Sequence, residues 1–295
     1  MAWWWLNQND EDSDYWDEEL VVVPRRDKLG RTAPGYAASA DMAPGDLGFA
    51  FLGGDLQAVF AVMEKSEEEA VPMGEEDKRR AARIVPCRFH DLFEPISFET
   101  LTTALRALLP LTDSPLDPES DRKETRVFPI GDVLIERLRR MVADGEPMGG
   151  ALAEAMCSAL AASDMDDDTL AALNAARIGS GPFRDNTLAL WDGACAVSGS
   201  RIAELVQVAT IKAWTESTNE ERLDGENGLP LLPTWLFAFG QGLVSFADDG
   251  AVMLSESLTV DEARQAGLDP AARVAIKGER QRAFLAWHRD NVFGR

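Results

Sequence analysis

Histidine and cysteine, which often serve in acid–base chemistry and as ligands of transition metals, are scarce in this chain of 295 residues. It contains two histidines, His90 and His288, which are far apart in the sequence, and three cysteines, Cys87, Cys157 and Cys195. Hydrolytic metal sites usually use two or more histidines close together, and an odd number of widely spaced cysteines predicts neither a disulfide framework nor a zinc knuckle. We therefore expect no bound metal and no cofactor.

Aromatic side chains at the amino terminus could instead hold a nucleobase. Four of the eight tryptophans lie within the first sixteen residues, and stacking on an aromatic ring is worth about 1–3 kcal/mol per base. On a strand Trp3 and Trp5 face one way and Trp4 the other, so one face can line a pocket while the other packs a core. The neighbouring amides of Asn7 and Gln8 can both donate and accept hydrogen bonds, so they could read the edge of a base. The alternative is that the tryptophan rings fill the core of a small barrel and that the two amides end a strand. The base-binding candidates are Trp3, Trp4, Trp5, Asn7, Gln8 and Trp16.

Basic residues cluster in two short segments. Residues 24–31 (PRRDKLGR) contain four basic residues and one acidic residue, and Lys78-Arg79-Arg80 with Arg83 forms the second cluster. Either could contact phosphates or form a solvated face. The phosphate-contact candidates are Arg25, Arg26, Lys28 and Arg31. The run Asp10–Glu19, with seven acidic residues in ten, would repel phosphates unless it folds away from them.

Short apolar runs separated by turns predict a small α+β unit with a curled sheet over residues 1–142. Gly53-Gly54-Asp55 predicts a hairpin, because glycine readily adopts positive φ. Ser97 can cap a helix over Phe98–Leu109, and apolar residues from Ile130 to Val142 recur at helical spacing. The predicted strands are Ala2–Leu6, Leu20–Val23, Leu47–Leu52, Leu56–Met63 and Ala82–Phe89.

The composition changes over residues 143–182, which are acidic and rich in alanine and glycine. This segment is predicted to be a linker with one or two short helices. Residues 183–295 again have the apolar patterning of a globular domain, with a hairpin around Asp248-Asp249-Gly250 and a terminal helix near Glu279–Arg289. The sequence thus predicts two domains and a linker.

Motifs in residues 1–142 resemble the EVE group of PUA-like domains. They are Ala2–Gln8 (AWWWLNQ), Pro24-Arg25-Arg26 with Gly30-Arg31, the turn Met42–Leu47 (MAPGDL) and Leu56–Val62. The resemblance implies a small curled β-barrel with helices, in which a flipped-out base, often methylated, is held between aromatic rings. Such domains are often found ahead of HNH domains in modification-dependent restriction enzymes.

Residues 183–295 resemble the HNH endonuclease family, whose fold is a ββα-metal unit. The landmarks are Phe183-Arg184, residues 193–199 (GACAVSG), the segment Cys195–Phe246, and residues 284–293 (FLAWHRDNVF), which include His288 in the surrounding scaffold. In that family one histidine acts as general base on water, an asparagine orients it, and a second histidine with an acidic residue holds a divalent metal.

Three of these four positions have changed. Thr210 stands for the base histidine, Leu236 for the helix histidine and Gly240 for the metal aspartate, while the asparagine is retained as Asn227. A threonine hydroxyl has far too high a pKa to act as a base, and leucine and glycine supply no ligand atoms. The resemblance therefore implies a nuclease fold without nuclease activity.

The overall charge adds a further constraint. The formal net charge is −22 and the pI about 4.4, which opposes DNA binding over most of the surface. A halophilic origin would account for the acidity equally well. Because no apolar run reaches the length of a membrane span and no signal-peptide pattern begins the chain, we expect a soluble cytoplasmic protein that does not bind membranes.

Three functions fit these observations. The first is a non-catalytic binder of DNA or of a modified base in a restriction, defence or regulatory context, with arginine clusters beside the aromatic pocket. The second is an acidic protein that imitates DNA or contacts a protein partner or a second copy, with carboxylates along one continuous face. The third is a nuclease with non-standard residues, whose only candidate carboxylates near Thr210 are Glu216, Glu220, Glu221, Asp224 and Glu226.

Overall fold

The chain folds into two compact units, Met1–Met165 (unit 1) and Asp166–Arg295 (unit 2). The computed structural model describes residues 1–8, 14–26, 30–33, 35–73, 78–109, 116, 126–145 and 150–294. Lys28 lies outside the described residues, and so does the first part of the acidic run, residues 10–13. Among the described residues no helix combines the length and hydropathy needed to cross a membrane.

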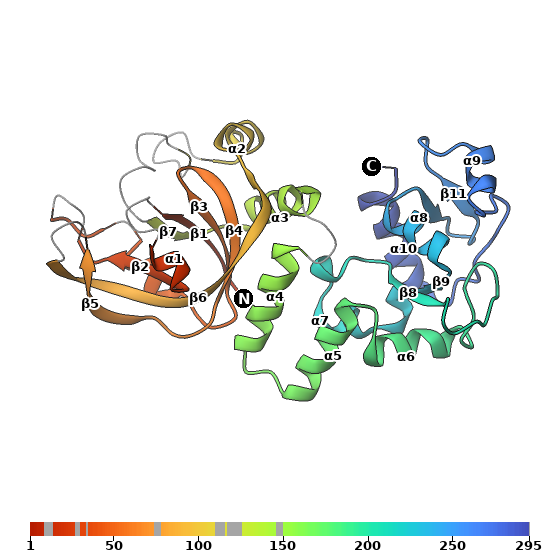
Figure 1. The fold of residues 1–295 in the computed structure, drawn as a ribbon, viewed down its shortest axis with the longest axis horizontal. Coiled ribbons are helices and arrows are strands. Elements are labelled where there is room, and N and C mark those ends of the chain that lie inside the picture. The colour runs from red at the N-terminus through yellow and green to blue at the C-terminus, as the bar shows by residue number, and fades with distance from the viewer. Residues whose placement is uncertain are drawn as a thin grey trace. The chain divides into compact units, whose positions relative to one another are not determined.

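Unit 1 is an α+β unit built around one curled sheet (Figure 1). Within its described part the strand order is β2-β6-β4-β3-β1-β7, with β5 pairing the first part of β6. All neighbouring strands are antiparallel except β1 and β3, which are parallel. The strands are β1 (Trp3–Gln8), β2 (Leu20–Pro24), β3 (Leu47–Leu52), β4 (Asp55–Val62), β5 (Glu67–Met73), β6 (Lys78–Ile96) and β7 (Arg126–Pro129). The helices are α1 (Asp14–Asp17), the 3-10 turn η2 (Ala38–Asp41), α2 (Phe98–Leu105), α3 (Asp132–Gly145) and α4 (Ala151–Ala162).

Several predicted elements of unit 1 are confirmed. The β3–β4 hairpin turns at Gly53 and Gly54, whose φ angles are +62° and +95°, values that side chains with a Cβ rarely adopt. Ser97 caps α2 by accepting a hydrogen bond from the backbone N–H of Thr100, although the helix ends at Leu105 rather than Leu109. The strand predicted over Ala82–Phe89 is the middle of the longer strand β6.

Strand β5 was not predicted, because its sequence EEEAVPM shows no alternation of apolar and polar residues. It forms through its pairing with β6, and its buried residue Val71 packs with Val22 of β2 and Ala82 of β6. We call the side of the sheet that carries these three residues the Ala82 face. Val21, Val23 and Val85 lie on the opposite side, which we call the Val85 face and which packs Trp4 and Phe60.

The predicted linker does not form a separate segment. Its alanine-rich part is helix α4, which packs on β4 and β6 of unit 1; Ala155 and Ala159 are fully buried, because small side chains let a helix approach a sheet closely. His90 Nε2 of β6 lies 3.0 Å from Ser158 Oγ of α4. The rest of the predicted linker belongs to unit 2, so the division between the two units falls within residues 143–182, after Met165.

Unit 2 combines short helices with two small antiparallel strand pairs in its described residues. The order in its centre is strand, strand, helix: β8 pairs β9, and α8 follows directly. The hairpin around Asp248-Asp249-Gly250 and the terminal helix are confirmed as β10–β11 and α10. The elements are α5 (Asp167–Arg177), α6 (Gly181–Leu190), β8 (Gln207–Thr210), η3 (Trp214–Glu216), α7 (Asn219–Leu223), η4 (Gly225–Asn227), β9 (Gly228–Leu231), α8 (Pro233–Gly240), β10 (Val244–Phe246), β11 (Val252–Leu254), α9 (Val260–Gln265) and α10 (Glu279–Asn291).

Candidate functional site

The four positions matched to nuclease residues lie on β8, β9 and α8 or directly beside them. Thr210 ends β8 and is half-buried, and Asn227 immediately precedes β9, where the pairing sets Thr210 opposite Gly228. Leu236 lies on α8 and packs partly buried against the core of unit 2, and Gly240 is exposed at the end of that helix. No side chain at positions 210, 236 or 240 offers a base or a metal ligand, so a catalytic metal does not fit this donor set.

Asn227 holds the connection between β8 and β9 together. Its side chain is fully buried. Its Oδ1 accepts a hydrogen bond from the backbone N–H of Lys212 at 2.8 Å, and its Nδ2 donates to the carbonyl oxygens of Lys212 and Glu221. Because these bonds satisfy a buried amide, the geometry gives Asn227 a structural task.

The five carboxylates considered for an unusual nuclease do not converge into a metal site. Glu221 Oε2 pairs with Lys212 Nζ at 2.7 Å. Burial by itself would raise the pKa of Glu221. Hydrogen bonds from Lys212 and Thr218, together with the positive charge of Lys212, outweigh this effect and lower the pKa below its usual value. Asp224 pairs with Arg280 at 2.8 Å, and Glu226 accepts the backbone N–H of Gln281. In the part of the chain that the structure describes, no three His, Cys, Asp or Glu side chains are grouped to hold a metal.

His288 is a core residue of unit 2. It is 2% exposed and stacks on Phe239, with ring centroids 3.7 Å apart and planes 6° apart. Its Nε2 donates to the carbonyl oxygen of Phe239 and its Nδ1 accepts from the hydroxyl of Ser245, both at 3.0 Å, if the ring is neutral. Burial lowers the pKa of His288 to about 4, which keeps the ring neutral near pH 7.

Protonation of His288 is expected to destabilise unit 2 at acidic pH. The unfolded chain binds a proton near pH 6.5, whereas the folded chain does so only near pH 4. Stability is therefore complete above pH 6.5 and falls toward pH 4, by about 3 kcal/mol for this group. Urea unfolding of the full chain between pH 7.5 and 4.5, compared with His288→Gln, isolates this contribution. A difference between the two proteins that does not change with pH would contradict it.

The three consecutive tryptophans of β1 are buried in unit 1. Trp5 is completely buried, and its ring lies between Phe51, 3.8 Å away with planes 8° apart, and Phe128 at 5.8 Å. Trp3 stacks on Phe49 at 5.0 Å and is 9% exposed. In the described structure these ring faces are therefore already occupied by phenylalanines.

The remaining base-binding candidates are also packed. Trp4 Nε1 donates to Asp46 Oδ2 at 3.0 Å within the core of the Val85 face. Trp16 is half-buried and stacks on Phe89 at 4.6 Å. Asn7 and Gln8 are 3% and 2% exposed, and Asn7 Oδ1 accepts the indole N–H of Trp5.

The two arginine clusters, in contrast, meet at one end of the sheet. Strand β2 runs antiparallel to β6, and beyond its end the backbone N–H of Arg25 donates to the carbonyl oxygen of Ala81 at 2.9 Å. A bridge between Arg26 and Thr32 holds the following loop beside this point. We call this region the arginine end; it comprises Arg25, Arg26, Arg31, Arg79, Arg80 and Arg83, all exposed except Arg83.

Strand alternation divides the arginine end between the two faces. Arg79 and Arg83 are six and two positions from Val85, respectively, and share its face, and Arg25 follows Val23 by two positions. Beside them Tyr36 packs against the core of the Val85 face, with the Arg83 guanidinium 5.0 Å from its ring centroid.

Tyr36 was not singled out in the sequence because nothing in its neighbourhood marks it. Burial raises the pKa of its hydroxyl, and the nearby Glu68 carboxylate adds to this effect, while Arg83 and Arg25 oppose it. In the sheet order β3 and β4 lie between the tryptophan strand β1 and β6. Within the described residues Tyr36 contacts the arginine end through the guanidinium of Arg83.

Comparison with known proteins identifies no family for this chain. No protein-family model matches it, and no curated protein matches it. Among solved structures, the NMR structure of Rpa0253 from Rhodopseudomonas palustris is similar at 17% sequence identity and a TM-score of 0.31. The similarity covers 50% of this chain and 97% of Rpa0253.

Proposed function

We propose that this chain is a non-catalytic nucleic-acid-binding protein. In this proposal the arginine end of unit 1 holds the phosphate backbone, and unit 2 is an HNH-like ββα unit without the groups for hydrolysis. The observation that carries the proposal is the convergence of two arginine clusters, far apart in the sequence, on one end of a sheet.

The local charge supports this assignment. The arginine end has six guanidinium groups, and the neighbouring strand β5 adds Glu67, Glu68 and Glu69. Among the described residues this region therefore has an excess of positive charge, although the chain carries −22 overall. Most of the affinity of a protein for DNA comes from such phosphate contacts, which release counterions. The surrounding negative field would confine a polyanion to this end.

A finer proposal is that the bound DNA carries a modified base, in a restriction, defence or regulatory context. It is supported by the resemblance to EVE domains and by the clustered aromatic rings of β1, β3 and β7. A base could stack on Trp5 only if Phe51 or Phe128 moved aside, since both faces of the indole are covered. The binding experiment therefore includes a methylated duplex beside the unmodified one.

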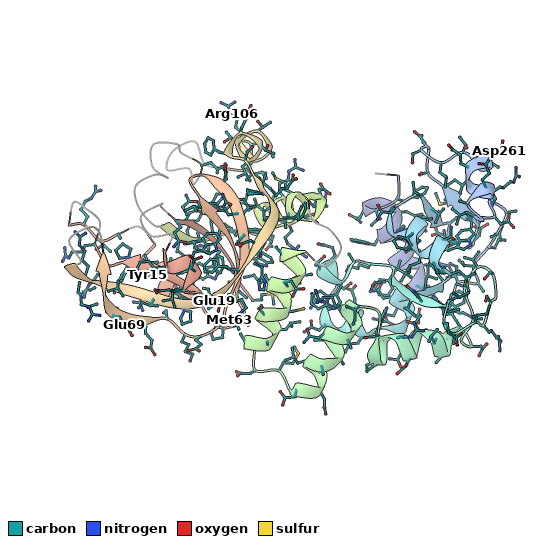
Figure 2. The ribbon with its side chains drawn as sticks, in the orientation of Figure 1. Tyr15, Glu19, Met63, Glu69, Arg106 and Asp261 are labelled. Atoms are coloured by element: carbon teal, nitrogen blue, oxygen red, sulfur yellow. The ribbon has the colours of Figure 1, made fainter. Side chains whose placement is uncertain are left out.

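Replacing Arg25 and Arg79 by alanine is expected to weaken DNA binding at least tenfold and to reduce the slope of log K against log salt by about two, one for each lost phosphate contact. Fluorescence anisotropy with labelled duplexes from 50 to 300 mM salt measures both quantities. Arg106→Ala is the matched control, because Arg106 is an exposed arginine that lies on the α2 side of unit 1, well away from β5 (Figure 2). Equal binding by all three proteins, or no binding by the unaltered chain, would overturn the proposal.

A second candidate function is binding of a basic protein partner by unit 2. It is favoured by an open depression of about 730 Å³ that contains Glu220, Asp224 and Glu226 beside the single cation Arg280. The exposed Leu190 and the neighbouring Leu223 supply an apolar part of its lining. A chain that binds no DNA at any salt concentration but forms a complex with a basic protein or a second copy would favour this function.

A further inference from the structure

We propose that Glu68 is a specificity-determining residue of the arginine end, because it competes with phosphate for Arg83. A ligand must displace the Glu68 carboxylate from Arg83 in order to bind there. Only a ligand with several closely spaced phosphates, which contacts the neighbouring arginines at the same time, would then bind well. The inference rests on the proposed function and names a determinant of ligand choice within that same site.

The pairing of β5 with β6 sets Glu68 directly opposite Arg83. Arg83 Nη2 and Glu68 Oε1 are 2.9 Å apart, and the two side chains are 15% and 52% exposed, respectively. The carboxylate is thus more exposed than the guanidinium that it contacts. A phosphate that binds Arg83 would have to compete with Glu68 for the guanidinium N–H groups.

The residues around Arg83 confine the competition between Glu68 and phosphate to this one arginine. The guanidinium lies over the ring of Tyr36, which limits its freedom to turn toward a ligand elsewhere. On the Val85 face Arg79 lies four positions before Arg83 along β6, with Ala81 between them, and Arg25 lies opposite Ala81 beyond the end of β2. Of the three, only Arg83 has a carboxylate as its direct cross-strand neighbour in the described residues.

The other glutamates of β5 are placed differently. Glu69 is opposite Ala82 and Glu67 is opposite Ile84, so both side chains project from the Ala82 face. Figure 2 shows Glu69 on β5 at the margin of unit 1. Glu68 and Glu69 therefore contribute the same charge from adjacent positions on one strand, but only Glu68 contacts an arginine of the Val85 face.

The test compares Glu68→Gln with Glu69→Gln in the full chain. Both changes remove one negative charge at nearly the same place, so they alter the long-range field equally. We expect Glu68→Gln to tighten binding of a 20-base-pair duplex about five- to tenfold at 50 mM salt, and Glu69→Gln to change it less than twofold, because close charge pairs are screened least. Equal effects of the two variants, or weaker binding by Glu68→Gln, would overturn the inference.

A double-mutant cycle shows whether the effect passes through Arg83. In an Arg83→Ala background Glu68→Gln should change the affinity less than twofold, since there is no guanidinium left to release. A full five- to tenfold gain in that background would count against the competition.

Failure of this inference and failure of the proposed function give different results. If the unaltered chain binds DNA and Arg25→Ala/Arg79→Ala weakens it, but Glu68→Gln has no effect, only the role of Glu68 is refuted. If none of the proteins binds DNA, the proposed function fails as well.

A competition experiment with inorganic phosphate tests the preference for several phosphates. At millimolar concentration, inorganic phosphate should not displace the duplex from the unaltered chain but should displace it from the Glu68→Gln protein. Competition that is the same for both proteins contradicts the selection of closely spaced phosphates.

Discussion

Incubation of the full chain with plasmid DNA and Mg²⁺, Mn²⁺ or Zn²⁺ is expected to leave the DNA intact, whether or not it is methylated. Phosphodiester hydrolysis needs an activated water and stabilisation of the leaving oxygen. Thr210 cannot supply the first, and Leu236 and Gly240 cannot hold an ion for the second. Loss of one member of such a set usually lowers the rate by orders of magnitude, and here three are changed.

Gel electrophoresis of supercoiled plasmid measures this outcome, because a single cut converts it to the relaxed form. Thr210→Ala and Asn227→Ala serve as controls for a contaminating nuclease. If the unaltered chain cuts DNA and either variant abolishes the cutting, unit 2 has a mechanism that the present interpretation misses. Cleavage that persists in both variants points to contamination.

Replacement of Trp5 by alanine is expected to destabilise unit 1 by about 3–5 kcal/mol, as for other large aromatic residues removed from a core. Trp5 is completely buried and stacked on both sides, so its loss leaves a cavity between Phe51 and Phe128. It also removes the indole N–H that the buried Asn7 amide accepts. The midpoint of urea unfolding of unit 1, followed by hydrogen exchange of its peptides, measures the effect.

Trp16→Ala is the matched control, since Trp16 is half-buried and stacks on the ring of Phe89. We expect it to cost less than half as much. A Trp5→Ala protein that keeps its stability but loses discrimination for a methylated duplex would contradict the core assignment. That result would instead support the base-reading role considered from the sequence.

The burial of these rings illustrates where sequence reasoning stops. Alternation along β1 correctly separates Trp4 from Trp3 and Trp5, but it does not say whether either side faces a pocket. In the structure both sides are packed, because β3 and β7 set Phe51 and Phe128 beside Trp5 and α4 covers neighbouring parts of the sheet. The alternation of side chains along a strand predicts the face of the sheet on which each one lies, but it does not predict which residues pack against that face.

The composition of residues 143–182 did not show that part of this segment packs on unit 1. Alanine and glycine are common in linkers, but alanine also forms helices well and allows close packing. Helix α4 is held by the sheet beneath it, and that partner is distant in the sequence. The packing of α4 on the sheet of unit 1 could therefore not be read from composition.

The sequence by itself determined the features that depend only on residues close together in the chain. The β3–β4 turn required two glycines at positive φ, Ser97 capped α2, and the lack of a general base at positions 210, 236 and 240 follows from residue type alone. Long-range pairing decided the rest. Strand β5 forms because it pairs with the first part of β6. The arginine end forms because the register between β2 and β6 sets the two arginine clusters side by side. A register shifted by one residue would send Arg25 and Arg83 to the opposite face, so only the tertiary structure could bring these charges together.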